Sequence, residues 1–262
     1  MVFAWTKKQR RKRLLATPFP QDWREGILQD VAFCRGLEPR ERSKLEDDLR
    51  ILVAEVSWEA CGGLALTQPM KAVIAAQACL LVLNRSIDDF VHVRAVLVYP
   101  EAYWAPSRAL DASGLVTEGE QARSGEAWSR GTVVLSWADA EDGGRFGTDG
   151  RNLVLHEFAH QLDMADHVVD GTPILDRKED YSQWRFIMTA EFQRLRSLVE
   201  SGGETVLDPY GATNEAEFFA VATELFFERP AYLRQRRPAL YDLLAGYYRQ
   251  DPAQRGQAAP SG

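Results

Sequence analysis

Two histidines and a glutamate in the middle of the chain have the spacing of a metal-binding helix. His156, Glu157 and His160 form the pattern H-E-x-x-H within the apolar run from Asn152 to Asp163. On a helix, residues four apart lie on one face, so the two imidazoles could bind one metal ion. Glu157 would point about 100° away around the helix axis, beside the ion rather than toward it. The pattern therefore predicts metal-assisted hydrolysis with Glu157 as the general base.

Apolar side chains around this pattern could bury the other faces of the helix, and no Pro or Gly interrupts it. They are Leu153, Val154, Leu155, Phe158, Ala159 and Leu162. The alternative is a buried helix whose two histidines are satisfied by core hydrogen bonds. That alternative requires the residue types and the spacing to coincide by chance in a chain with only 4 His. We therefore favour a metal site.

A third protein ligand should lie elsewhere, because a catalytic zinc normally has three protein ligands and a water. His167 does not fit the extended pattern H-E-x-x-H-x-x-G-x-x-H, since this sequence has aspartates where that pattern needs Gly and the third His. Acids in the apolar stretch 214–228 are better candidates, because a carboxylate that enters a core needs a partner such as a metal. Glu215 begins this stretch, where the helix dipole alone could explain it. The spacing allows Glu217 or Glu224, and either could instead lie on a solvated helix face.

Length and composition are those of a soluble globular protein. With 262 residues, the chain could form one large domain, or a catalytic domain with a helical appendage. The formal net charge of -7 argues against a general nucleic-acid binder. No apolar run approaches the length of a membrane span. The three cysteines are far apart and lack a C-x-x-C partner, which favours a reduced, cytoplasmic location.

Residue patterns divide the chain into four segments. We predict a basic N-terminal arm (1–17), a helical N-terminal portion packed on the core (18–90), a zincin-like catalytic domain (91–250) and a disordered tail (251–262). The arm contains the basic run Lys7–Arg13, which no secretory-length apolar segment follows, so we expect a solvated, frayed terminus. Within the helical portion, periodicity predicts helices over Leu37–Glu59 and Met70–Leu83. The second is apolar nearly all round, as expected for a helix packed inside the domain.

Short strands are predicted before the metal-binding helix. Alternating residues indicate strands over Val91–Tyr99 and Gly131–Trp137, and glycines in 142–150 indicate a flexible approach to the helix. In zinc peptidases, a strand beside the active helix offers its edge to an extended peptide, and Gly131–Trp137 is the candidate here. The alternative is an ordinary α+β core, which the same pattern would also fit. After the metal-binding helix, we expect helices over Tyr181–Glu200, over Asn214–Glu228 with Thr213 or Asn214 as N-cap, and from Pro238 to about Tyr248, with a turn between Pro230 and Pro238.

Four stretches occur in an order typical of one family: I-A-A-Q-A-C-L-L-V-L (74–83), G-x-V-V-L-S-W (131–137), N-L-V-L-H-E-F-A-H-Q-L-D (152–163) and P-Y-G-A-T-N-E-A-E-F-F-A-V (209–221). Together they resemble the Mlc titration factor A family, zinc-dependent peptidases related in their core to the anthrax lethal factor catalytic domain. The resemblance runs from about Pro18 to Tyr248. It implies an α+β fold with a zincin-like metallopeptidase core.

The resemblance also implies a Zn2+ site with His156, His160 and Glu217 as ligands. It implies Glu157 as the catalytic glutamate and Tyr210 as an active-site tyrosine. Glu217 is selected over Glu224 by this comparison and not by the spacing. Tyr210 could hydrogen-bond the oxyanion of a tetrahedral intermediate, although a turn tyrosine that packs its ring is the alternative. Asp163, three residues after His160, is a candidate acceptor for a ligand imidazole.

Zinc-dependent hydrolysis of a peptide substrate, of aminopeptidase type, is therefore the expected function. Glu157 would take a proton from the zinc-activated water and deliver it to the leaving amine. The same family is named for binding a glucose-responsive transcriptional repressor and removing it from DNA. A regulatory binding protein with a secondary zinc site is thus the alternative. The intact His-Glu-His set favours the enzyme, because binding alone would not need Glu157.

Overall fold

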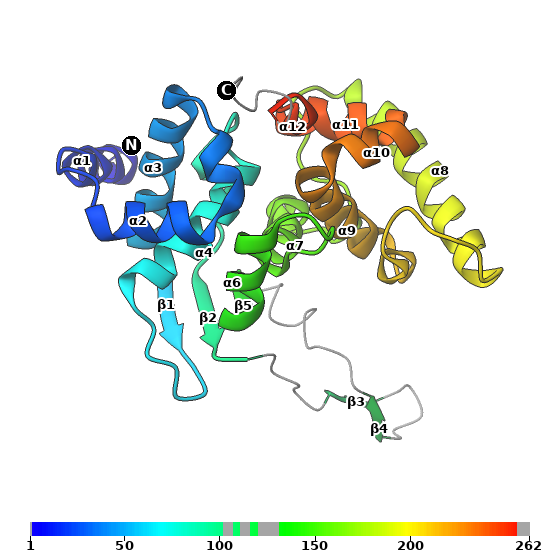
Figure 1. Ribbon diagram of the computed structural model, residues 1–262, viewed down its shortest axis with the longest axis horizontal. Coiled ribbons are helices and arrows are strands. Elements are labelled where there is room, and N and C mark those ends of the chain that lie inside the picture. The colour runs from blue at the N-terminus through cyan, green and yellow to red at the C-terminus, as the bar shows by residue number, and fades with distance from the viewer. Residues whose placement is uncertain (1, 102–106, 111–115, 120–130, 256–262) are drawn as a thin grey trace, which may run out of the picture.

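The computed structural model describes residues 2–101, 107–110, 116–119 and 131–255. This part of the chain is mostly helical (Figure 1). Its α-helices are α1 (Val2–Leu15), α2 (Gln21–Asp30), α3 (Pro39–Glu55), α4 (Gln68–Leu81), α6 (Trp137–Phe146), α7 (Leu153–Asp163), α8 (Asp180–Glu200), α9 (Glu215–Glu228), α10 (Pro230–Arg236), α11 (Pro238–Tyr248) and α12 (Pro252–Arg255). Short 3-10 helices connect some of them: η1 (Ala32–Gly36), η2 (Ile87–Phe90), η3 (Met164–Asp166) and η4 (Pro209–Ala212).

Three of the described strands form a small parallel sheet, in the order β1 (Ser57–Ala60), β2 (Ala95–Tyr99), β5 (Thr132–Ser136). Val96 and Val98 of β2 are buried opposite Val133 and Leu135 of β5. Val134 and other alternate residues face outward and are less buried, as the period of two requires. A separate antiparallel pair joins β3 (Ser107–Leu110) to β4 (Val116–Gly119). Helices and strands together make this an α+β protein.

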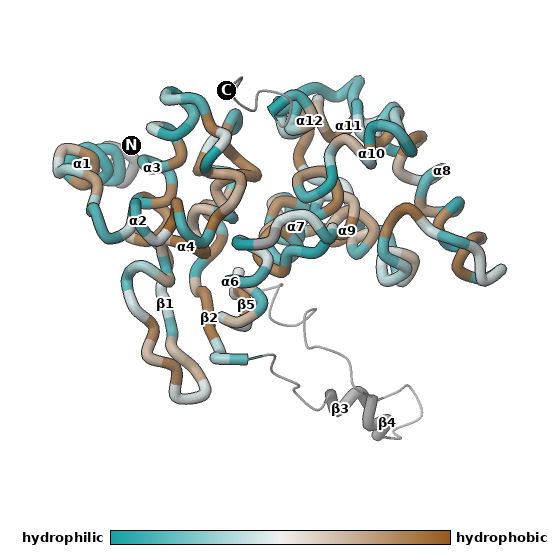
Figure 2. The backbone as a smooth tube through the Cα atoms, viewed as in Figure 1, coloured by the Kyte–Doolittle hydropathy of each residue, from teal (hydrophilic) through white to brown (hydrophobic). Residues whose placement is uncertain are grey.

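Helix α4 occupies the interior, as its composition predicts. Its residues from Ala72 to Leu81 are all buried, and it packs against α2, α3, α6 and α7. Figure 2 shows hydrophobic residues along α4 and β2, in contrast to the hydrophilic α1. The buried apolar residues of the N-terminal helices and of α7, α9 and α11 form one hydrophobic core. None of the described helices is long and apolar enough to cross a membrane.

The basic N-terminal stretch forms α1 instead of the frayed arm that we expected. Arg11 donates to both carboxylate oxygens of Glu55, at 2.9 and 2.7 Å. Lys7 donates to Asp88 at 2.9 Å. These carboxylates on α3 and η2 attract one side of the basic helix, which explains why the charge run is held against the protein. Lys8 and Lys12 remain exposed.

The disordered tail was predicted to begin at residue 251, but the chain continues into α12 over Pro252–Arg255. Ala253 is buried, and its amide donates to the hydroxyl of Tyr241 at 3.1 Å. Arg255 also donates to Glu41 of α3. Residues 256–262 lie outside the described residues, so the rest of the tail prediction stays a prediction.

Other element boundaries differ from the sequence-based expectation. Val91–Arg94 belong to a turn, so β2 is shorter than predicted. The four-residue strand β1 replaces the predicted end of a longer helix. Residues after Pro230 form α10 rather than a turn. Between Glu101 and Gly131, the described residues are those of β3 and β4.

The glycines before the metal-binding helix are also placed differently. Gly143 and Gly144 lie inside α6, where we expected a flexible loop. A Cβ atom on Gly144 would lie 2.3 Å from the carbonyl oxygen of Asp30 at the end of α2. Glycine is thus needed here for the close approach of two helices, and its sequence signal is the same as that of a flexible loop.

Candidate metal centre

Helix α7 carries both histidines, and its first turn is fixed by a buried cap. The side-chain oxygen of Asn152 accepts a hydrogen bond from the amide of Leu155 at 3.0 Å. This satisfies one of the free amides at the helix start. The apolar faces of α7 are buried, as predicted, while the side chain of His156 remains 12% exposed. His156 and His160 therefore leave the helix together on the face that meets α9.

Helix α9 supplies buried carboxylates. Asn214 is its N-cap, as predicted, and accepts from the amide of Glu217 at 2.9 Å. All residues from Ala216 to Glu228 are buried, including Glu217, Glu224 and Glu228. Burial of a carboxylate is costly unless a hydrogen-bonding or charged partner compensates. The solvated helix face that we considered for Glu217 and Glu224 is therefore excluded, and each needs a partner.

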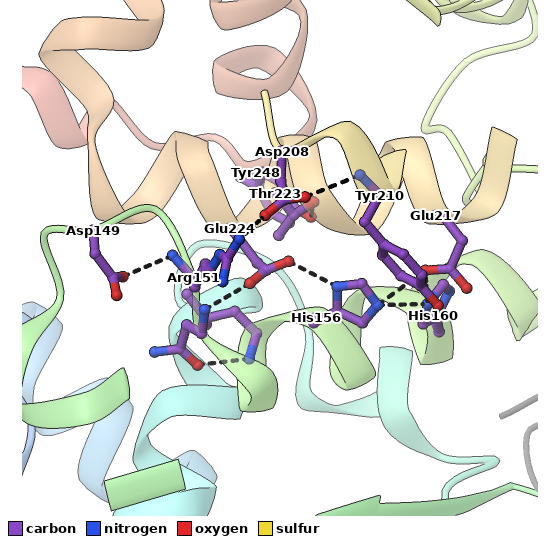
Figure 3. Close-up of polar contacts among 12 residues, drawn as sticks. Asp149, Arg151, His156, His160, Asp208, Tyr210, Glu217, Thr223, Glu224 and Tyr248 are labelled. Atoms are coloured by element: carbon purple, nitrogen blue, oxygen red, sulfur yellow. Dashed lines mark hydrogen bonds and ion pairs between the residues drawn. The ribbon is translucent and has the colours of Figure 1, made fainter. Parts of the chain in front are cut away.

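Three side-chain atoms from α7 and α9 form a small triangle (Figure 3). The Nε2 atoms of His156 and His160 lie 3.2 Å apart, and Glu217 Oε2 lies 3.1 Å from the first and 3.4 Å from the second. The ligands of a tetrahedral ion lie about 3.3 Å apart when the ion–ligand bonds are about 2.0 to 2.1 Å. Two imidazole nitrogens and a carboxylate oxygen at these separations therefore fit one metal ion.

Hydrogen bonds between these histidines and glutamates shift their pKa values. Burial alone would lower the pKa of His156, but its hydrogen bonds with Glu217 and Glu224 outweigh burial and raise it to about 10. Burial alone would raise the pKa of Glu217, but hydrogen bonds from His156 and His160 lower it to about 2. Positive charge is thus stabilised at this point, and a bound cation would replace the protons.

Glu224, the alternative third ligand, lies at the other nitrogen of His156. Its Oε1 is 2.7 Å from Nδ1, whereas Glu217 faces Nε2 (Figure 3). Because Nδ1 and Nε2 point in different directions, Glu224 is directed away from the triangle. In the described residues, the metal-binding cluster consists of His156, His160 and Glu217.

Tyr210 stands at the rim of this site, in η4. Its ring centroid is 6.1 Å from that of His156, and half of the residue is exposed. Partial burial and the negative charges of Glu217 and Glu157 raise the pKa of Tyr210 to about 12. The phenol therefore stays protonated at neutral pH and can donate a hydrogen bond. Because Tyr210 lies in a turn with its ring near that of His156, the role of Tyr210 at an oxyanion stays a prediction.

A cavity of about 740 Å³ opens beside the triangle and is lined by His156, Glu157 and Tyr210. The other charged residues that line the cavity are one arginine, Arg151, and five acids: Asp139, Asp142, Asp149, Asp208 and Glu224. Arg151 is itself paired with Asp208 at 2.5 Å. The cavity thus offers a negatively charged space next to two imidazoles, a carboxylate and a phenol.

Two other positions considered from the sequence are not part of the metal-binding cluster in the described residues. His167 is an exposed residue in the left-handed region, with φ 72°, at the end of η3, and is not part of the cluster. Asp163 accepts from the amides of Gly171 and Thr172 at 3.0 and 2.7 Å, so both its oxygens bind the following loop. Glu224 is the carboxylate that bonds Nδ1 of the ligand imidazole of His156. Sequence reasoning missed this contact, because a seven-residue separation from Glu217 does not reveal which nitrogen each acid meets.

The predicted substrate strand corresponds to β5, between Thr132 and Ser136, and Trp137 instead begins α6. Among the described strands, β5 lies at the edge of the sheet next to β2. It also contacts α7, so a strand lies beside the histidine helix.

A family of metallopeptidases and several known proteins match most of this chain. The family described as "Glucose-regulated metallo-peptidase M90" matches residues 5–249. An uncharacterized protein of Synechocystis is 39% identical over 93% of this chain and 89% of its own length. The Mlc titration factor A of Klebsiella pneumoniae is 35% identical over 84% and 83% of the two chains. That of Serratia proteamaculans is 31% identical over 97% and 94%.

Proposed function

Because this chain belongs to the glucose-regulated metallo-peptidase M90 family, we propose that it hydrolyses peptide bonds with a zinc ion held by His156, His160 and Glu217. The observation that carries this proposal is the triangle of two imidazole nitrogens and one carboxylate oxygen, with sides of 3.1 to 3.4 Å. Nitrogen and oxygen donors in this combination are typical of catalytic zinc sites with an open position. When bound, zinc supplies a Lewis acid that polarises a carbonyl and acidifies water.

The remaining residues of the cavity would carry the proton transfers. Glu157 follows the first ligand and lines the cavity, so it can accept a proton from the attacking water and deliver it to the leaving amine. Tyr210 keeps its proton at neutral pH, since its pKa is about 12. It can therefore donate a hydrogen bond to the carbonyl oxygen as negative charge develops.

A zincin-like arrangement of the core is part of the proposal. The histidine helix α7 contacts β5, an edge strand of the described sheet. An extended peptide that pairs with β5 would have its backbone beside the metal site. Pairing through the backbone would bind many peptide sequences, and the cavity would then provide the selectivity.

Aminopeptidase activity is supported by the charge of the cavity. A peptide N-terminus carries an ammonium group, which needs anionic partners near the scissile bond. Asp139, Asp142 and Asp149 line the same cavity as the candidate ligand His156. We propose that this acidic wall attracts the free amino terminus of a small peptide.

The first test compares the wild type with Glu157→Gln and the control Glu200→Gln, which changes an exposed glutamate at the end of α8. Each protein is loaded with zinc and incubated with aminoacyl p-nitroanilides and their N-acetylated forms. We expect hydrolysis to fall by about 10²- to 10⁴-fold in Glu157→Gln, with zinc content unchanged, because the general base is lost. Glu200→Gln should keep wild-type activity, and the acetylated forms should not be cut.

Two results would contradict this function. One is a wild type that holds zinc but cuts no free or acetylated peptide. The other is equal hydrolysis by Glu157→Gln and wild type. Cleavage of acetylated peptides as fast as free ones would contradict the aminopeptidase preference alone.

A second function is suggested by the names of the relatives, two of which are called Mlc titration factor A. A cytoplasmic protein of this kind could bind a transcriptional repressor of sugar uptake, with the zinc site secondary. The Glu157→Gln variant distinguishes the two functions, because repressor binding would persist when the general base is removed. A pull-down of a purified repressor of this class with both proteins measures that binding.

A further inference from the structure

We infer that Glu224 is a positioning residue, which holds the imidazole of His156 so that Nε2 faces the metal. This inference rests on the proposed zinc site. An imidazole has two ring nitrogens, and when one binds a metal the other carries a proton. Glu224 Oε1 lies 2.7 Å from Nδ1 of His156, where it would accept that proton in a hydrogen bond.

The carboxylate of Glu224 is itself held in place. Its second oxygen, Oε2, accepts the backbone amide of Asn152 at 2.6 Å, so both oxygens are used. The carbonyl of Asn152 in turn accepts from the amide of His156 at 2.9 Å. Glu224 therefore connects α9 to the first turn of α7 and to the ring of its first histidine. The side chains of Glu224 and His156 are only 9% and 12% exposed, so water competes little for this bond.

A wider buried network fixes Asn152. Its side-chain amide donates to Gln77 Oε1 at 3.0 Å and to Glu228 Oε1 at 3.2 Å. Gln77 of α4 donates further to the carbonyl of Ala140 in α6 at 2.8 Å. The orientation of His156 is thus connected through hydrogen bonds to four helices, α4, α6, α7 and α9. A ring held in this way loses little freedom when a metal binds, which favours affinity.

Glu228 provides a matched control for Glu224. Both glutamates are buried on α9 and both bond to Asn152, but Glu228 bonds to its side chain and Glu224 to its backbone amide. Glu224 also bonds to the ring of His156, whereas the hydrogen bond of Glu228 goes to the side chain of Asn152. The same change, Glu to Gln, replaces one carboxyl oxygen by an amide nitrogen in each, with almost no change in volume. A role in the buried network alone would affect the two variants alike.

The test measures zinc affinity by competition with a chelator for wild type, Glu224→Gln and Glu228→Gln, and records the ring ¹H–¹⁵N signals of His156 in the zinc-loaded wild type. We expect zinc affinity to fall about 10- to 100-fold in Glu224→Gln and to stay at the wild-type value in Glu228→Gln. In the wild type, Nδ1 should carry a slowly exchanging proton. In Glu224→Gln, that proton should exchange faster with water.

Three results would overturn the inference while leaving zinc binding intact: wild-type affinity in Glu224→Gln, an equal loss in Glu228→Gln, or a zinc-loaded wild type in which Nε2 of His156 carries the proton. The third result is measured on the wild type alone, so it does not depend on whether a variant folds. If the wild type binds no zinc, the proposed function itself fails, and the two failures are thus distinguishable.

Discussion

Three glutamates of α9 are buried, and each has different partners. Glu217 faces two imidazole nitrogens, and Glu224 bonds one imidazole and one backbone amide. Glu228 accepts from the side chain of Asn152, while its Oε2 has no hydrogen-bond partner in the described part of the chain. Burial, with the nearby charges of Asp149 and Glu224, raises the pKa of Glu228 to about 8. Glu228 is therefore protonated in the folded state at neutral pH.

Replacement of Glu228 should reveal this protonation as a pH-dependent stability difference. The folded pKa of about 8 lies above the ordinary value of 4.5, so the folded state binds more protons than the unfolded state between these pH values. Stability from this group is complete below pH 4.5 and is lost as pH rises through 8. We expect Glu228→Gln to match the wild type near pH 5 and to exceed it at pH 8.5 by on the order of 3 kcal/mol. Urea unfolding of both metal-free proteins checks this, and an equal difference at both pH values would contradict it.

Residue spacing predicted the histidine pair well, because an i, i+4 relation on a helix determines which face two side chains share. It could not separate Glu217 from Glu224. The two acids are seven residues apart and share a face of α9, so both were compatible with a ligand. The distinction comes from the position of α9 against α7, which places Glu217 at Nε2 and Glu224 at Nδ1 of His156.

Helix caps fix both helices of the site. Asn152 caps α7 and Asn214 caps α9, each through a side-chain oxygen. We expect Asn214→Ala to lower the free energy of unfolding by about 1 kcal/mol, because Asn214 is exposed and the substitution removes mainly its capping hydrogen bond. Asn152→Ala should cost about 2 to 4 kcal/mol, because buried bonds to Gln77 and Glu228 are lost as well. Urea denaturation measures both, and equal losses would show that the buried bonds of Asn152 contribute nothing.

Long periodic helices were predicted within a few residues, because their apolar stripes are set by local sequence. α4, α8, α9 and α11 are examples. The misses are elements that depend on distant contacts. The β1 strand exists because it pairs with β2, with Trp58 opposite Val96. Helix α1 is held by acids of α3 and η2, which lie far away in the sequence.

The candidate metal centre depends on the whole molecule, because its ligands His156 and Glu217 are 61 residues apart in the sequence. A contact from the C-terminal part of the chain to α4 helps to join the helical portion and the catalytic portion. Gln250 donates to the carbonyl of Leu80 at the end of α4, at 2.8 Å. The division into a helical portion and a catalytic domain at residue 90 stays a prediction, since the buried apolar residues on both sides form one core. Family resemblance selected Glu217 in advance, and packing of α9 on α7 explains that choice physically.

Anomalous X-ray diffraction at the zinc absorption edge, from crystals of the zinc-loaded protein, would show directly which residues bind the ion. We expect one strong peak per chain within about 2.0 to 2.2 Å of Nε2 of His156, Nε2 of His160 and a carboxylate oxygen of Glu217. The Nδ1 nitrogen of His156 should remain bonded to Glu224. A zinc peak coordinated by Glu224 in place of Glu217, or the absence of any peak at the two histidines, would contradict the proposed zinc site.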